Sequence, residues 1–398
     1  MFLQEFCGSW MDHPFWRSKF LLENPEDIKT ILASSIREVW IDTSKGLDVE
    51  DGQGVLAEQT EEEIKAEAEH VLTEAVSKVV ERVEIAAEME RAAKICSQAK
   101  QAVSSMFNEA RMGKALDAAD AMPLVEEIAT SVYRNPSAII SLARLKTADE
   151  YTYMHSVAVC ALMVSLARQL GMNETQARQA GMAGLLHDIG KMMVPMEILN
   201  KPGRLTDEEF SIVKSHPAEG HKLLLEGQGV DEVTLDVCLH HHEKMDGSGY
   251  PDRLNQDNIS LFAKMGAVCD VYDAITSNRP YKNGWDPAES LRKMAEWSKG
   301  HFDQVVFQAF VKSVGIYPIG SLIRLESGRI GVVVDQNDKS LLTPKVKVFF
   351  STKSNLRIPP EVLDLASPAV RDKIVAREDP EKWNFADLNE LWGGITLW

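Results

Sequence analysis

Several features that define specialised protein classes are missing or scarce in this sequence. The 398 residues include five cysteines, which are scattered and lie mostly within apolar helical stretches. We therefore expect buried, reduced thiols rather than a disulfide framework. No uninterrupted apolar run is long enough to span a bilayer, and no signal peptide is recognisable. These absences predict a cytoplasmic protein without a membrane span.

An excess of basic residues is also missing. Lys and Arg number 43 against 60 Asp and Glu, which gives a formal net charge of −17 at pH 7. A general nucleic-acid-binding surface needs stripes of basic side chains to hold phosphates, so no DNA or RNA polymer is expected as a partner. A small anionic substrate stays compatible with this charge, because bound metal ions can invert the field inside one pocket.

Proline is absent from residues 58–122, and glycine occurs there only at Gly113. The stretch is rich in Ala and Glu, and its first part spaces apolar residues three or four apart, as in an amphipathic helix. The residues of this apolar pattern are Ile64, Ala68, Val71, Ala75, Val79 and Val83. A helix of this length usually packs against another helix, in the same chain or in a second copy. A homodimer through this helix is therefore one expected arrangement.

The sequence divides into four segments with different patterns. Residues 1–54 combine a helix start with a short strand and predict a small α+β module, and residues 55–130 form a helical Ala/Glu-rich connector. Residues 131–318 are a series of apolar-periodic helical segments separated by turns. In residues 319–398, alternation around Ser327-Gly328 predicts a β-hairpin followed by a further strand. The predicted fold class is mainly α: an all-helical domain with a small α+β N-terminal module and a small β-containing C-terminal extension.

The helical segment contains His and Asp residues that recur in order at steps of 25 to 32 residues. They are His155, His187, Asp188, His216, His241, His242 and Asp270. Imidazole and carboxylate together suit transition metals such as Mn, Fe, Co, Ni or Zn. Paired metals are the usual means of cleaving phosphate esters, so this pattern predicts a metal-dependent phosphohydrolase.

The local sequence indicates how these donors can meet. His187 and Asp188 are adjacent and would diverge by about 100° on a helix, but at a helix end before Gly190 both can turn into one cleft. The same holds for His241-His242, because the EKMDGSGYP segment ends their helix at once. His155 and Asp270 stand among apolar neighbours, where a buried charge needs a cation or a partner. A single histidine of this kind is more often a hydrogen-bonded core residue than a metal ligand. That interpretation would have to hold independently for each of the five histidines, so the metal site is favoured.

Three sequence motifs resemble those of a known family: HDIGK at 187–191, HHEKMDGSGYP at 241–251 and CDVYDAITSNRPYK at 269–282. They resemble the HD-GYP family of bacterial cyclic di-GMP phosphodiesterases, a branch of the HD metal-dependent phosphohydrolases, over about residues 130–318. The opening GSWMDHPFWRSKFLL is similar to an uncharacterised small domain often found N-terminal to such modules.

The resemblance implies an all-α domain with a dinuclear or trinuclear metal centre. On its pattern the metal ligands are His155, His187, Asp188, His216, His241, His242 and Asp270, with Asp188 bridging. Asp188 and Lys191 would be catalytic, with Lys191 on the scissile phosphate. Arg279 and Lys282 would hold the substrate's phosphates, and Gly249-Tyr250-Pro251 would shape the adjoining loop; Tyr250 would either stack on guanine or pack that loop.

One position departs from the trinuclear pattern, which has a Glu four residues before the first histidine. Tyr151 occupies that position here, and Glu150 lies about 140° around the helix from His155. We therefore expect two divalent metal ions, with Mn or Fe preferred and Co, Ni or Zn also suited. Asp273, one helical turn after Asp270, is either a partner that orients a His ring or Lys191, or an ordinary surface acid.

The expected function is metal-dependent hydrolysis of cyclic di-GMP to linear pGpG, with continuation to GMP left open. The resemblance also implies a role in biofilm and motility signalling. A second hypothesis keeps the fold and metals but changes the substrate to another cyclic dinucleotide or a nucleotide phosphate ester. A third is a regulatory module that binds cyclic di-GMP or a diguanylate cyclase (GGDEF) partner without turnover. The intact His187, Asp188, Asp270 and Lys191 disfavour the third hypothesis.

Overall fold

The structure is a computed structural model that describes residues 1–6, 20–22, 24–33, 39–46, 82–144, 151–201, 203–277, 284–337, 340–385 and 387–393. The chain forms two compact units, Met1–Arg82 and Val83–Trp398. Among the described residues, no helix is long and apolar enough to cross a membrane. Most of the apolar pattern from Ile64 to Val83 lies in residues 47–81, outside the described part, whereas residues 82–122 of the predicted helical stretch are described.

The first unit is a small α+β module, as the sequence predicts. Its elements are β1 (Phe2–Phe6), β2 (Phe20–Leu21), α1 (Pro25–Ala33) and β3 (Val39–Ile41). The strands form an antiparallel sheet in the order β2-β1-β3. Leu3 and Phe20 are the buried residues of its small core, and Ile31 of α1 packs against them.

The second unit is largely helical, which confirms the predicted fold class. Its helices are α3 (Ile85–Arg111), α4 (Ala118–Arg134), α5 (Pro136–Arg144), α6 (Tyr151–Gln169), α7 (Glu174–Leu186), the 3₁₀ helix η3 (Ile189–Met193), α8 (Met196–Leu199), α9 (Asp207–Val213), α10 (His216–Leu225), α11 (Glu232–His240), α12 (Leu261–Thr276), α13 (Pro287–His301), α14 (Gln304–Val314), α15 (Pro380–Trp383) and α16 (Leu388–Gly393). A capping box of Thr206 and Glu209 begins α9.

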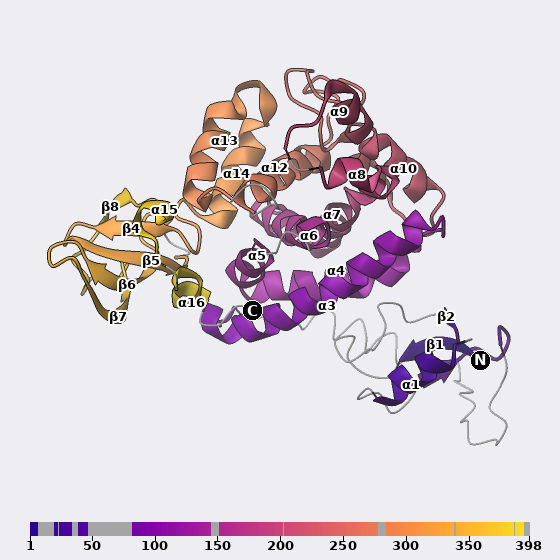
Figure 1. The fold of residues 1–398 in the computed structure, drawn as a ribbon, viewed down its shortest axis with the longest axis horizontal. Helices are drawn as coiled ribbons and strands as arrows, with labels where there is room; N and C mark the ends of the chain where they lie inside the picture. The colour runs from indigo at the N-terminus through magenta and orange to yellow at the C-terminus, as the bar shows by residue number, and fades with distance from the viewer. Residues whose placement is uncertain are drawn as a thin grey trace. The chain divides into compact units, whose positions relative to one another are not determined.

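Helices α6 and α7 form the centre of the helical body, as Figure 1 shows. Every residue from 154 to 167 of α6 is buried, because this helix is apolar around its whole circumference. It packs on α3, α5, α7, α12 and α14. Gly184 of α7 permits the closest approach, since a Cβ there would lie 2.9 Å from the carbonyl oxygen of Val159. The site described below therefore rests on a rigid centre.

The segment predicted as a connector contributes to this body. Helix α3 ends before Gly113, whose φ of 76° favours glycine, and the chain then turns into α4. Both helices pack on α5, α6 or α7. The proposed boundary at residue 130 stays a prediction, but the helices on either side of it share one core. Cys96, Cys160, Cys238 and Cys269 are buried free thiols in this core, as expected.

The C-terminal part contains a five-stranded antiparallel sheet in the order β7-β6-β5-β4-β8. Its strands are β4 (Leu322–Leu325), β5 (Arg329–Asp335), β6 (Lys345–Ser351), β7 (Leu356–Asp364) and β8 (Ile374–Arg377). The predicted hairpin is β4–β5, with Leu322 opposite Val332 and a turn at Gly328. The sequence did not indicate β7 and β8, because both are edge strands with largely exposed residues, and β7 contains Pro359-Pro360.

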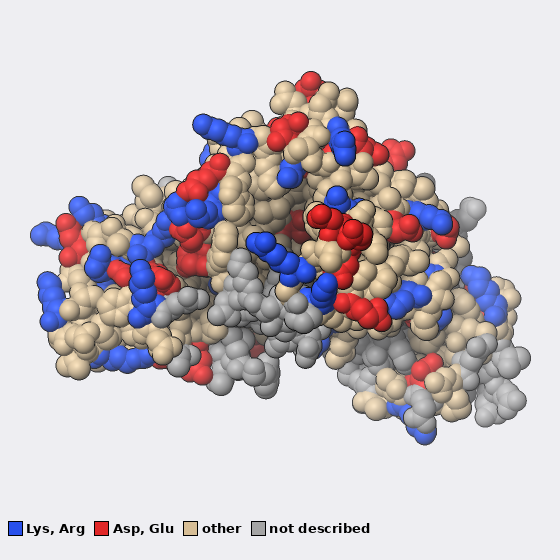
Figure 2. Space-filling model, turned by 45° about the horizontal axis from the view of Figure 1, so that its top comes forward, with Lys and Arg blue, Asp and Glu red and all other residues tan. Residues whose placement is uncertain are grey.

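The surface charge matches the composition. On the face shown in Figure 2, Lys and Arg side chains are intermingled with Asp and Glu, and no continuous basic stripe crosses it.

Candidate metal centre

Helix ends bring the predicted ligands together. His187 is the C-cap of α7, Asp188 begins η3, His216 begins α10 and His241 is the C-cap of α11. His155 and Asp270 project from within α6 and α12. Residues at helix ends are not restricted to one helical face, so the adjacent residues of each pair reach the same cleft, as the sequence predicts.

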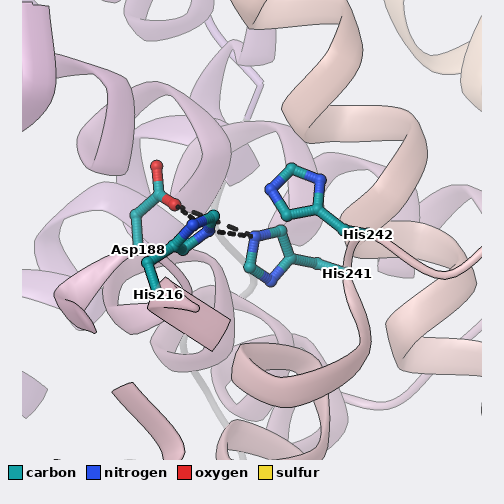
Figure 3. A group of neighbouring side chains, drawn as sticks. All are labelled: Asp188, His216, His241 and His242. Atoms are coloured by element: carbon teal, nitrogen blue, oxygen red, sulfur yellow. Dashed lines mark hydrogen bonds and ion pairs between the residues drawn. The ribbon is translucent and has the colours of Figure 1, made fainter. Parts of the chain in front are cut away.

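The seven side chains form two groups that share one residue. The first group is His155, His187, Asp188 and Asp270, and the second is Asp188, His216, His241 and His242; within each group the ligand atoms lie within 4.8 Å of one another. Figure 3 shows the second group, with His216 between Asp188 and His241. All seven predicted donors are therefore neighbours in space.

Asp188 offers one carboxylate oxygen to each group. Its Oδ2 lies 3.3 Å from Nε2 of both His155 and His187. Its Oδ1 lies 3.2 Å from Nε2 of His216. A carboxylate placed in this way has the arrangement of a ligand that bridges two cations.

Hydrogen bonds fix four of the five imidazole rings. The Nδ1–H groups of His187 and His216 donate to backbone carbonyls of the preceding turn, at 2.8 Å to Gly184 and 2.7 Å to Val213. His241 donates in the same way to Val237 at 3.0 Å. Each ring is thereby held with its Nε2 directed into the site, as in metal-ligating histidines.

The fourth ring is held by Asp273. The Nδ1–H of His155 donates to Oδ2 of Asp273 at 2.6 Å, and both side chains are buried. Of the two sequence interpretations of Asp273, the structure therefore favours the partner that orients a His ring. The carboxylate also makes the Nε2 of His155 a stronger electron donor.

The polar atoms at the centre are consistent with metal ions. Among the described residues, Nε2 of His187 and Oδ1 of Asp188 are buried and have no hydrogen-bond partner. A buried carboxylate oxygen without a donor is costly unless a cation compensates it. The His/Asp cluster is thus a metal-binding site by the chemistry of its donors.

The pKa values of His187, Asp188 and His241 show how these buried side chains share charge when no metal is bound. Burial disfavours a charged His187, but the carboxylates of Asp188 and Asp270 outweigh it and raise the pKa of His187 to about 10. Burial would raise the pKa of Asp188, yet Lys191 and the neighbouring histidines hold it well below its usual range. Burial and neighbouring imidazoles lower the pKa of His241, so that ring stays neutral and able to bind metal.

Lys191 and Tyr250 lie beside the donors. The Nζ of Lys191 donates a hydrogen bond to Asp188, one of the predicted ligands. The ring of Tyr250 stacks on His242, with centroids 4.7 Å apart. Its packing on a ligand histidine favours the loop-packing interpretation of Tyr250. Burial, together with Asp270 and Asp188, raises the pKa of its phenol, which therefore stays protonated.

Glu243, which was not among the residues predicted from the sequence, holds the loop after Tyr250. Its carboxylate is 2% exposed and accepts hydrogen bonds from the backbone N–H of Asp252, Arg253 and Leu254 at 2.7, 2.9 and 3.0 Å. Gly249 packs directly on it, since a Cβ there would lie 2.5 Å from Cα of Glu243. Its position directly after His241-His242 was the available signal.

Several residues named from the sequence are not described by the structure. Arg279 and Lys282 fall in residues 278–283, outside the described part, as does Glu150, and the side chain of Tyr151 is not described either. The expectation of two metals rather than three therefore stays a prediction. His240, which directly precedes His241, hydrogen-bonds Asp236 at 2.7 Å and Asp252 at 3.2 Å.

Two protein-family models match parts of this chain. An HD domain matches residues 126–306, and a domain of unknown function, DUF3391, matches residues 1–121. The chain is 56% identical to a cyclic di-GMP phosphodiesterase of Pseudomonas aeruginosa over all of this chain and 94% of that protein.

Other relatives match a shorter part. A cyclic di-GMP phosphodiesterase response regulator of Xanthomonas campestris is 42% identical over 36% of this chain and 40% of that protein. A 3'3'-cGAMP-specific phosphodiesterase of Vibrio cholerae is 36% identical over 42% of this chain and 38% of that protein.

Proposed function

Because the chain belongs to the HD-GYP family of cyclic di-GMP phosphodiesterases, we propose that it hydrolyses a phosphodiester bond of cyclic di-GMP and releases linear pGpG. The observation that carries the proposal is the placement of Asp188, whose two oxygens face two separate groups of donors. One relative matches this chain along nearly its whole length and is named for this activity.

Two divalent cations fit the donor sets, one for each group. The seven ligands divide evenly around Asp188, and mixed imidazole and carboxylate donors suit Mn or Fe best, with Co, Ni and Zn also accepted. A pair of such ions supplies Lewis acidity and lowers the pKa of coordinated water from 15.7 towards about 7.

The chain's own residues would position the cations and the substrate and would stabilise the charge that develops during the reaction. Asp188 and the histidines hold the cations, while Asp273 keeps the ring of His155 in one orientation. Lys191, at Asp188, neutralises charge that develops on the phosphoryl oxygens during in-line attack. Arg279 and Lys282 are proposed to hold the substrate's phosphates, and the planar guanidinium of Arg279 can bind one bidentately.

The principal alternative is a substrate with a different base, since a relative specific for 3'3'-cGAMP also matches this chain. A cyclic dinucleotide with one adenine is therefore the competing substrate. Binding of diguanylate cyclase (GGDEF) proteins, a homodimer through the long helix and a cytoplasmic location stay predictions.

The test is hydrolysis by the purified full chain supplied with Mn²⁺ or Fe²⁺. We expect metal-dependent pGpG formation, about two metals per chain, and loss of both in the His187→Ala/Asp188→Ala variant. Comparing cyclic di-GMP with 3'3'-cGAMP decides the base preference. If metal and nucleotide bind but neither nucleotide is cleaved, the proposal is wrong and the chain is a receptor.

A further inference from the structure

A groove of about 730 Å³ lies beside the metal centre. Its lining includes Phe210, Lys214, Ser215, Lys244, Tyr250 and Arg253. Two of these residues connect it to the metal ligands. Tyr250 stacks on His242, and Ser215 directly precedes His216. A ligand that reaches the metals therefore has the groove next to it.

Three cations of this groove have no acidic partner. Among the described residues, Lys214, Lys244 and Arg253 form no ion pair with a carboxylate, although many other Lys and Arg side chains do. Asp246 is near enough to Lys244 for that cation to contribute to lowering the pKa of Asp246. In a chain of net charge −17, three cations without an ion pair among the described residues, gathered in one concave surface, indicate an anionic ligand.

The groove also presents an aromatic ring. Phe210 is 48% exposed, and the Nζ of Lys214 lies 5.0 Å from its ring centroid. An exposed aromatic face beside a cation suits a flat base whose phosphate is nearby, because bases stack on aromatic rings and phosphates pair with Lys and Arg.

Arg253 is presented from a fixed loop. Its φ is 54°, an uncommon value for a residue other than glycine, and its backbone N–H donates to the buried carboxylate of Glu243 at 2.9 Å. Such a backbone persists only when its surroundings hold it, and it is frequent at ligand-binding sites.

A cyclic dinucleotide has two phosphodiesters, and only one can lie at the metals during cleavage. We propose that this groove binds the other half: Lys214, Lys244 and Arg253 hold the phosphodiester that is not cleaved, and Phe210 stacks on the adjoining purine. This assignment rests on the proposed function and names residues that select a cyclic dinucleotide over a small phosphate ester.

The test compares two substrates in the full chain loaded with Mn²⁺. Bis(p-nitrophenyl) phosphate needs only the metal centre, whereas cyclic di-GMP also fills the groove. For Lys214→Ala, Lys244→Ala and Arg253→Ala we expect kcat/KM for cyclic di-GMP to fall about tenfold each, mainly through KM. Hydrolysis of the small diester should stay close to the wild-type value, and Lys214→Arg should recover most of the loss. Phe210→Ala should raise KM for cyclic di-GMP, and Phe210→Tyr should not.

Lys222→Ala is the matched control, because Lys222 is an exposed lysine of α10 that does not line the groove. If the groove variants cleave both substrates equally poorly, or cleave cyclic di-GMP as the wild type does, the assignment is wrong while the proposed function stands. A wild-type chain that cleaves the small diester but not cyclic di-GMP would overturn the proposed function and this assignment with it.

Discussion

At the scale of single residues, the site depends on a few buried contacts that each fix one polar atom. Asp188 divides its two oxygens between two donor groups. Asp273 fixes His155 through one hydrogen bond, at 2.6 Å, without being one of the predicted ligands. Each contact makes a separate contribution to metal binding, so single substitutions can be used to measure them.

Asp273→Asn should weaken metal binding by about 10–100-fold, because the amide orients the His155 ring less firmly and leaves its Nε2 a poorer donor. The measurement is metal affinity by calorimetry, with circular dichroism to verify the fold. Asp257→Asn, at an exposed acid, is the control and should bind metal as the wild type does. Unchanged affinity in Asp273→Asn would show that the contact with His155 does not matter for the metal.

Metal binding should release protons. In the metal-free protein the pKa of His187 is raised from 6.5 to about 10, so the ring is protonated below that value and must lose its proton to bind a cation. Metal affinity should therefore rise with pH between 6.5 and 10. Calorimetry in buffers of different ionisation enthalpy should give at least one proton released per chain; no release would contradict the protonated state of His187.

At the scale of elements, close approaches between helix ends bring the ligands together. Gly190 of η3 lies against α10, and a Cβ there would meet the carbonyl oxygen of His216 at 1.9 Å and the backbone nitrogen of Gly220 at 2.4 Å. Gly266 of α12 faces Val237 of α11 in a similar contact, at 2.9 Å. At Gly190 the neighbours are backbone atoms, so η3 and α10 can adopt the observed spacing only with glycine there, whereas at Gly266 a larger residue would require the Val237 side chain to shift.

The loop after α11 is the element that joins the metal centre to the groove. Glu243→Gln should loosen it, because a neutral amide oxygen accepts the three backbone hydrogen bonds less strongly than a carboxylate. We expect a loss of about 1–3 kcal/mol in the free energy of unfolding and a higher KM for cyclic di-GMP.

Urea unfolding and steady-state kinetics measure both effects. Glu226→Gln, at an exposed acid after α10, is the control. Equal stability and KM in Glu243→Gln and the wild type would mean that the loop is held by other contacts.

At the scale of the whole molecule, the predicted metal centre lies where six helices of the helical body meet. Its ligands come from α6, α7, η3, α10, α11 and α12 or directly follow them. Contacts also tie the C-terminal sheet to this body: Lys345 pairs with Glu84 at 2.8 Å, and Arg144 donates to the carbonyl of Ile319 at 3.1 Å. Metal occupancy should therefore affect the stability of the entire second unit.

Removing the metal should lower the melting temperature of this unit. A cation that binds the folded chain alone adds about 2.7 kcal/mol when its concentration is 100 times its dissociation constant. We expect Mn²⁺ to raise the melting temperature in calorimetry, and a chelator to reverse the rise. Asp188→Ala should show almost no such response, and an equal shift in that variant would place the stabilising metal elsewhere.

The sequence determined the chemical identity of the site because ligand types and their order do not depend on packing. Its motifs predicted seven donors, which the structure brings together, and its helical periodicity predicted the mainly α fold. Gly190 and the segment after His242 correctly indicated helix ends, since these are local properties.

The tertiary structure alone decided how the donors are grouped and what surrounds them. The division of the Asp188 oxygens, the hydrogen bond from His155 to Asp273 and the anchoring of the loop by Glu243 join residues from different segments or turns. The edge strands β7 and β8 likewise depend on partners far along the chain rather than on their own mostly exposed residues. Such contacts are set by how helices and strands pack, and no local sequence pattern encodes those distances.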